Sequence, residues 1–164
     1  MGLGLLRAAP AVGALTMALV LARWPLQRRV GHRLLAAVAA FGLATIAFGL
    51  SRNFAFSLLA LVVSGAADNI SVVTRLTLVQ LETPDHMRGR VAAVNGIFIG
   101  ASTQLGEFES GAMAALLGPV ASVVAGGAGT LLVCAAWLRL FPTLARRDEL
   151  LPEAAAAGRS PQPR

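Results

Sequence analysis

The stretch SGAMAALLGPVASVVAGGAGTLLVCAAWL, residues 110–138, is the longest run of the chain without a charged side chain. It holds 29 residues, whereas a helix needs only about 20 mostly apolar residues to cross a bilayer core. Gly118 and Pro119 divide the run, which would otherwise be one overlong helix. We therefore predict that one membrane-spanning helix ends at this break and that another begins there.

Four further uncharged runs precede this one, at residues 8–22, 34–51, 53–67 and 91–106. Pro84 disfavours helix at Thr83 and so ends the third span. The chain is therefore predicted to be an all-α membrane protein with five transmembrane helices. Their expected bounds are residues 5–22, 34–50, 54–81, 90–117 and 120–140.

The composition excludes an ordinary soluble domain. Only 13% of the residues are charged and 56% are hydrophobic, while a soluble domain is about 25% charged. A net charge of +6 would suggest nucleic acid as the partner of a soluble protein. Here the arginines lie mainly between apolar runs, so we interpret them as topology signals. The expected partner is the lipid bilayer and not nucleic acid.

The arginines also predict an orientation. Arg7 and Arg52 lie on one side of the predicted bundle. Nine lie on the other, and the positive-inside rule makes that side cytoplasmic: Arg23, Arg28, Arg29, Arg33, Arg88, Arg90, Arg139, Arg146 and Arg147. We expect a multi-pass protein of the cell (inner) membrane with residues 1–147 in the bundle and residues 148–164 as a disordered cytoplasmic tail. An odd number of spans then places the first residue outside, which suggests that preceding helices are missing.

Two loops carry a recognisable pattern. Residues 25–33, PLQRRVGHR, resemble the cytoplasmic arginine and glycine loop of the major facilitator superfamily, and residues 83–91, TPDHMRGRV, resemble its loop between helices ten and eleven. Residues 106–111, GEFESG, are similar to the eleventh helix in the branch that includes enterobactin-type exporters. The loop residues that carry the resemblance are Arg28, Arg29, Gly31, Arg33, Pro84, Asp85, Arg88, Gly89 and Arg90.

This resemblance covers residues 3–147 and implies that the five spans correspond to helices 8–12 of a twelve-helix transporter. It implies a fragment or C-terminal half of a secondary active transporter, which exports a small siderophore-like or drug-like molecule by alternating access with protons as the coupling ion. The missing N-terminal half would be supplied in cis or in trans. Gln27 stands near where the family has an acid, so a gate built on that acid is not carried over.

An alternative from another class is a membrane structural or assembly subunit without transport, or an inactive truncated product. The sequence contains no nucleophile elbow, phosphate-binding loop, metal-ligand spacing or Cys/His pair. We therefore expect neither enzymatic activity nor a cofactor or metal ion. Cys134 lies within the last span and is expected to pack there as a small apolar residue.

Polar groups at membrane depth are the candidate functional residues. In the third span Ser64, Asp68, Ser71 and Arg75 fall on one helix face. Asp68 lies about 21 Å along that helix, where it is either a proton-coupling or substrate-contacting acid or a structural acid bonded to a neighbouring helix. Arg75 lies about 31 Å along it and is expected to hold the loop or extend to the interface in preference to contacting substrate.

The fourth span offers a second set. Asn95 and Glu109 share one face, while Glu107 points about 160° away from Glu109. Each acid is either a titrating group of a proton-coupled exporter or an interfacial acid, and the GEF stretch favours Glu107. Gln104 is a weaker polar candidate.

Two further patterns occur in the last two spans and in the third loop. The pair Gly96 and Gly100, and the cluster formed by Gly126, Gly127 and Gly129, predict close helix packing. The Arg88-Gly89-Arg90 segment (residues 88–90) either binds lipid headgroups, latches against an N-terminal half, or acts only as a topology signal.

Overall fold

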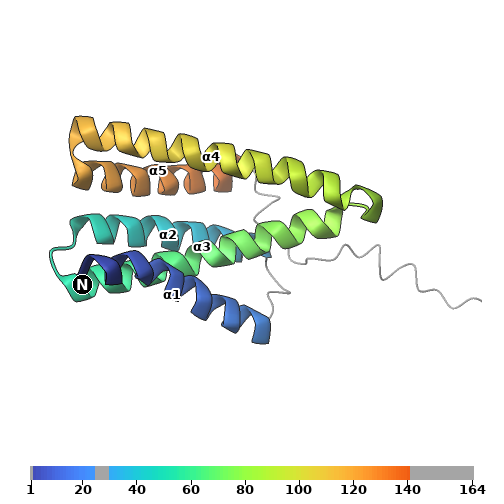
Figure 1. Ribbon diagram of the computed structural model, residues 1–164, viewed down its shortest axis with the longest axis horizontal. Helices are drawn as coiled ribbons and strands as arrows, with labels where there is room; N and C mark the ends of the chain where they lie inside the picture. The colour runs from blue at the N-terminus through green and yellow to red at the C-terminus, as the bar shows by residue number, and fades with distance from the viewer. Residues whose placement is uncertain (1, 25–29, 141–164) are drawn as a thin grey trace, which may run out of the picture.

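The computed structural model describes residues 2–24 and 30–140, and every regular element there is helical (Figure 1). The elements are α1 (Gly2–Arg23), α2 (Val30–Leu50), α3 (Phe54–Glu82), the short 3₁₀ helix η1 (Asp85–Met87), α4 (Arg88–Leu117) and α5 (Pro119–Leu140). The five long helices match the five predicted spans, with ends that differ by at most four residues. The all-α prediction is confirmed, and the predicted tail lies outside the described residues.

The connections form where the sequence breaks the helices. The side-chain oxygen of Asn53 accepts hydrogen bonds from the backbone N–H groups of Ala55 (2.9 Å) and Phe56 (3.4 Å) and so caps the start of α3. Gly118 adopts a φ of 85°, which favours glycine. Its position between α4 and α5 confirms the predicted break before Pro119.

The helices pack in an order that differs from their order along the chain. α1 packs on α3, α3 on α2, α2 on α5, and α5 on α4. Figure 1 shows α3 and α4 extending beyond the ends of α2 and α5 to meet at η1. Consecutive helices α3 and α4 are therefore joined at one end of the bundle without packing along their lengths.

Small residues make the helix contacts. The buried apolar residues of the described chain are Ala9, Ala37, Ala44, Ala60, Ala67 and Cys134, and no large side chain there is fully buried. The Cys134 thiol donates a hydrogen bond to the carbonyl oxygen of Leu35 at 3.5 Å, which confirms that this residue packs between helices. Large apolar side chains point outward, for example Leu19 (65% exposed) and Leu132 (71% exposed). This distribution suits a lipid solvent, because leucine loses nothing by facing lipid tails.

Glycine permits the closest approaches. A Cβ added to Gly65 on α3 would lie 2.0 Å from the carbonyl oxygen of Pro10, and one added to Gly13 on α1 would lie 1.9 Å from that of Val62. Gly127 on α5 meets Gly42 and Ile46 on α2 in the same way. The predicted packing is therefore confirmed at Gly127.

At the other glycines of the two predicted sets the structure shows open space. A Cβ at Gly96, Gly100, Gly126 or Gly129 would have no neighbour within 4 Å. The packing prediction is wrong for these four positions within the described fold. Four-residue or clustered spacing of glycines allows close helix contact but does not supply the neighbouring helix.

Four of the five helices, α1, α2, α3 and α5, are long and apolar enough to span a membrane. α4 has 30 residues and sufficient length, but it is not among the four, because Gln104, Glu107 and Glu109 interrupt its apolar character. The chain is thus an all-α membrane protein whose fourth long helix is the most polar.

Candidate functional site

The predicted polar stripe of α3 lies on one continuous helix, and its members differ in burial. Ser64 is buried, and its hydroxyl donates a hydrogen bond to the carbonyl oxygen of Leu61 at 2.8 Å. Asp68 and Arg75 are exposed, and Ser71 is half-buried. Among the described residues the Asp68 carboxylate has neither a hydrogen bond nor an ion pair. It is therefore accessible at the surface of this helix bundle.

Two buried polar groups on α3 lack partners. The side-chain oxygens of Asn69 and Thr74 are buried and make no hydrogen bond in the described structure. An unsatisfied buried polar atom costs about 1–3 kcal/mol. Thr74 was not predicted from the sequence, although it continues the spacing of Ala60, Ser64 and Ala67 along one helix face.

The candidates on α4 are separated from those on α3. Gln104, Glu107 and Glu109 are all exposed, and the described residues provide no hydrogen bond or ion pair for either carboxylate. α3 and α4 share no packed interface along their lengths. The structure therefore does not bring Glu107 or Glu109 together with Asp68, and the roles of all three acids stay predictions.

The loop between α3 and α4 is a self-bonded turn. The guanidinium of Arg88 forms an ion pair with Asp85 at 2.9 Å, and its Nε donates to the carbonyl oxygen of Thr83 at 3.4 Å. Pro84 accepts a hydrogen bond from the Met87 N–H at 2.9 Å and precedes η1. The spacing of three residues between Asp85 and Arg88 is the signal from which this pair could have been predicted.

Other loop residues fall partly outside the described chain. Arg28 and Arg29, together with Gln27, lie beyond the described residues. Gly31 is buried at the start of α2, while Arg33 is exposed. Gly89 is exposed in the first turn of α4 and a Cβ there would meet open space. Thus the second loop motif, unlike the first, has a complete geometry.

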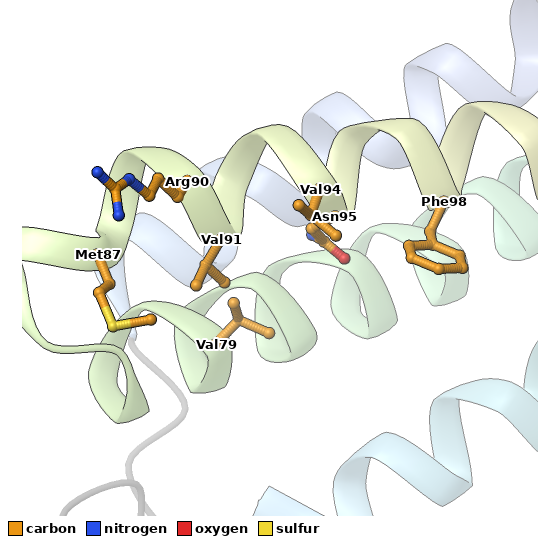
Figure 2. Close-up of a pocket in the computed structure, with 7 residues that line it drawn as sticks. All are labelled: Val79, Met87, Arg90, Val91, Val94, Asn95 and Phe98. Atoms are coloured by element: carbon orange, nitrogen blue, oxygen red, sulfur yellow. The ribbon is translucent and has the colours of Figure 1, made fainter.

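A groove between α3 and α4 was not predicted from the sequence. Its larger hollow has a volume of about 460 Å³ and a smaller one beside it about 190 Å³. Val79, Val91 and Asn95 line both. Figure 2 shows Val79 of α3 facing the α4 side chains that line the larger hollow. We call the two hollows the α3–α4 groove; the larger is lined by Val79, Met87, Arg90, Val91, Val94, Asn95 and Phe98.

The fold and the polar residues define a class, a multi-pass α-helical membrane protein with ionisable side chains on its long helices. Comparison with known proteins shows which member of this class the chain resembles. The chain is 28% identical over 159 residues to the enterobactin exporter EntS of Escherichia coli. The match covers 95% of this chain and 38% of that exporter. It confirms the resemblance to a major facilitator exporter that the loop motifs predicted.

No family model matches the chain. No solved structure matches it either. The chain spans 38% of the length of the exporter it resembles, so the activity of a whole exporter belongs to the proposals below.

Proposed function

We propose that this chain is the C-terminal part of a major facilitator exporter that expels a small molecule in exchange for protons. The similarity to an exporter over 95% of the chain carries this proposal. The order of five long helices and the two loop patterns support it. The substrate class we propose is siderophore-like or drug-like, in keeping with the resemblance.

We also propose the inner membrane as its location, with the C-terminus in the cytoplasm. In the described residues the helix ends at one side of the bundle carry Arg23, Arg33, Arg88, Arg90 and Arg139. The opposite end carries Arg7 in the first turns of α1 and Arg52 between α2 and α3. An excess of arginine marks the cytoplasmic side.

Alternating access requires a second body against which this bundle moves. We propose an N-terminal half, in the same polypeptide or another, as that body. The exposure of Gln104, Glu107 and Glu109 on α4 supports this, because polar and ionisable side chains within a membrane usually face protein or water.

For the coupling step we propose that Asp68 gains and loses a proton as the cavity alternates between the two sides. A charged carboxylate at membrane depth costs about 2.5–3.5 kcal/mol on insertion scales, so protonation favours one arrangement of the helices over another. The exposed carboxylate of Asp68, unpaired among the described residues, supports this role. Glu107 is the second candidate for the same role.

The test is export by the transporter that contains this segment together with its N-terminal half. In inside-out vesicles, Asp68→Asn should abolish uptake driven by a pH gradient while membrane insertion stays normal. Glu153→Gln removes an acid of the C-terminal region and is the matched control, which should transport at the wild-type rate. Normal transport by Asp68→Asn would remove Asp68 from the mechanism.

The proposal has a genetic test that separates it from a non-transporting subunit. A reading frame upstream of Met1 that encodes seven matching helices, in frame or after a frameshift, would support the exporter. An unrelated upstream sequence would exclude a half encoded in the same gene and favour a membrane assembly subunit.

A further inference from the structure

The α3–α4 groove changes in polarity along its length. Arg90 lies in the first turn of α4, Asn95 lies about 7.5 Å farther along the helix axis, and Phe98 about 12 Å farther. Figure 2 shows these side chains in that order, with Val91 and Val94 between them. The groove therefore passes from a cation, through an amide, to an aromatic and aliphatic wall.

The two arginines near the groove differ in their partners. Arg88 forms an ion pair with Asp85 at 2.9 Å and lines the smaller hollow. Arg90 lines the larger hollow, and no described acid pairs with it. Among the described side chains none neutralises the positive charge at the end of the groove next to η1, and the natural complement of that charge is an anion.

We propose that the α3–α4 groove binds one anionic phospholipid. The Arg90 guanidinium holds the headgroup phosphate by charge-assisted hydrogen bonds. The Asn95 amide, one and a half turns deeper, donates to an ester carbonyl of the lipid. One acyl chain lies along Val79, Val94 and Phe98. The order of charge, amide and hydrocarbon in the protein repeats the order of phosphate, ester and acyl chain in the lipid.

The lining of the larger hollow suits an acyl chain next to an anionic group. Five of its seven lining side chains are apolar, and Arg90 supplies a positive charge. This site does not rest on the exporter proposal.

The experiment is native mass spectrometry of the full 164-residue chain, purified in mild detergent and incubated with phosphatidylglycerol or phosphatidylcholine. The wild-type chain should retain one phosphatidylglycerol in preference to phosphatidylcholine. Arg90→Gln should lower phosphatidylglycerol retention about five- to tenfold. Arg139→Gln is the matched control, because Arg139 is also exposed at the same end of the bundle but lies on α5, outside the groove.

A second pair of variants tests the apolar part. Val94 is 54% exposed and Leu132 is 71% exposed, so a tryptophan at either position displaces no core residue. Val94→Trp should lower phosphatidylglycerol retention to the level of Arg90→Gln, because the indole fills the groove, whereas Leu132→Trp should have no effect.

Three results would overturn the site. Equal losses in Arg90→Gln and Arg139→Gln would indicate general attraction of anionic lipid. Wild-type retention by Val94→Trp would place the lipid elsewhere. Equal retention of the two lipids by the wild-type chain would remove the anionic preference and with it the role of Arg90.

Discussion

Glycine occurs both at the α1–α3 crossing and on α4, but it is closely packed only at the crossing. At the crossing, Gly13 and Gly65 bring two backbones so close that a Cβ on either would overlap a carbonyl oxygen. On α4, Gly96 and Gly100 have four-residue spacing, yet a Cβ on either would meet open space. Small residues therefore allow close packing but do not by themselves select the helices that pack.

Gly65→Ala tests the close packing of the α1–α3 crossing most directly. The added methyl would lie 2.0 Å from the Pro10 carbonyl oxygen, and because that atom is backbone the whole of α1 must shift. We expect a loss of about 3 kcal/mol in the free energy of unfolding, at the upper end of overpacking effects. Denaturant unfolding of the detergent-solubilised chain, followed by circular dichroism, measures this loss.

The matched control is Gly100→Ala on α4. It should be neutral or stabilise the chain by about 0.5–1 kcal/mol, because alanine favours helix more than glycine does. Equal destabilisation by the two variants would mean that α4 also packs closely in the folded chain.

A second test compares two adjacent glycines of α5. A Cβ at Gly127 would lie 2.6 Å from a side-chain carbon of Ile46 and 2.8 Å from the Gly42 carbonyl oxygen, while Gly126 has no neighbour within 4 Å. We expect Gly127→Ala to cost about 1–2 kcal/mol, since Ile46 can move in part. Gly126→Ala should cost nothing, and the same unfolding measurement checks both. A reversed order would show that α5 is rotated about its axis.

The N-terminal ends of α3 and α4 differ in their capping. Asn53 caps α3 with two hydrogen bonds, whereas Met87 precedes α4 without a side-chain cap. Asn53→Ala should therefore lower the unfolding free energy by about 1 kcal/mol. Arg52→Ala, one residue earlier and without a capping role, serves as the control. A loss of the same size in Arg52→Ala would assign the effect to the turn as a whole.

The smallest expected effect is at the η1 turn. The side chains of Arg88 and Asp85 are 55% and 87% exposed, so solvent screens their ion pair. A double-mutant cycle of Arg88→Gln and Asp85→Asn should give a coupling energy of about 0.5 kcal/mol or less, falling as salt is added. A coupling above about 1 kcal/mol would show that a further group rigidifies this turn.

The helices were largely predictable because their limits depend on local chemistry. Pro84 and the Gly118-Pro119 pair interrupt helices wherever they occur, and the uncharged runs between them match the length of a span. α4 shows the limit of that approach. Its ends were predicted to within two residues, but its polar residues leave it outside the helices that qualify as spans by apolarity.

The residue types of the candidate site could be predicted from the sequence, but the burial and neighbours of their side chains could not. Periodicity placed Ser64, Asp68, Ser71 and Arg75 on one face of α3, which the continuous helix allows. It did not reveal that Ser64 is buried while Asp68 is exposed, because burial depends on where α1 and α2 cross α3. The unpartnered oxygens of Asn69 and Thr74 depend on those same crossings.

The amino-acid sequence alone determined that this chain is helical, membrane-embedded and similar to an exporter, because hydrophobic run length, helix breakers, arginine placement and loop motifs are local properties. Only the tertiary structure decided that α3 and α4 separate along their lengths while α1 and α3 cross closely. The groove between α3 and α4, with Arg90 at one end and Phe98 farther in, arises from that separation. It depends on the relative placement of two helices, and no pattern within either helix specifies it.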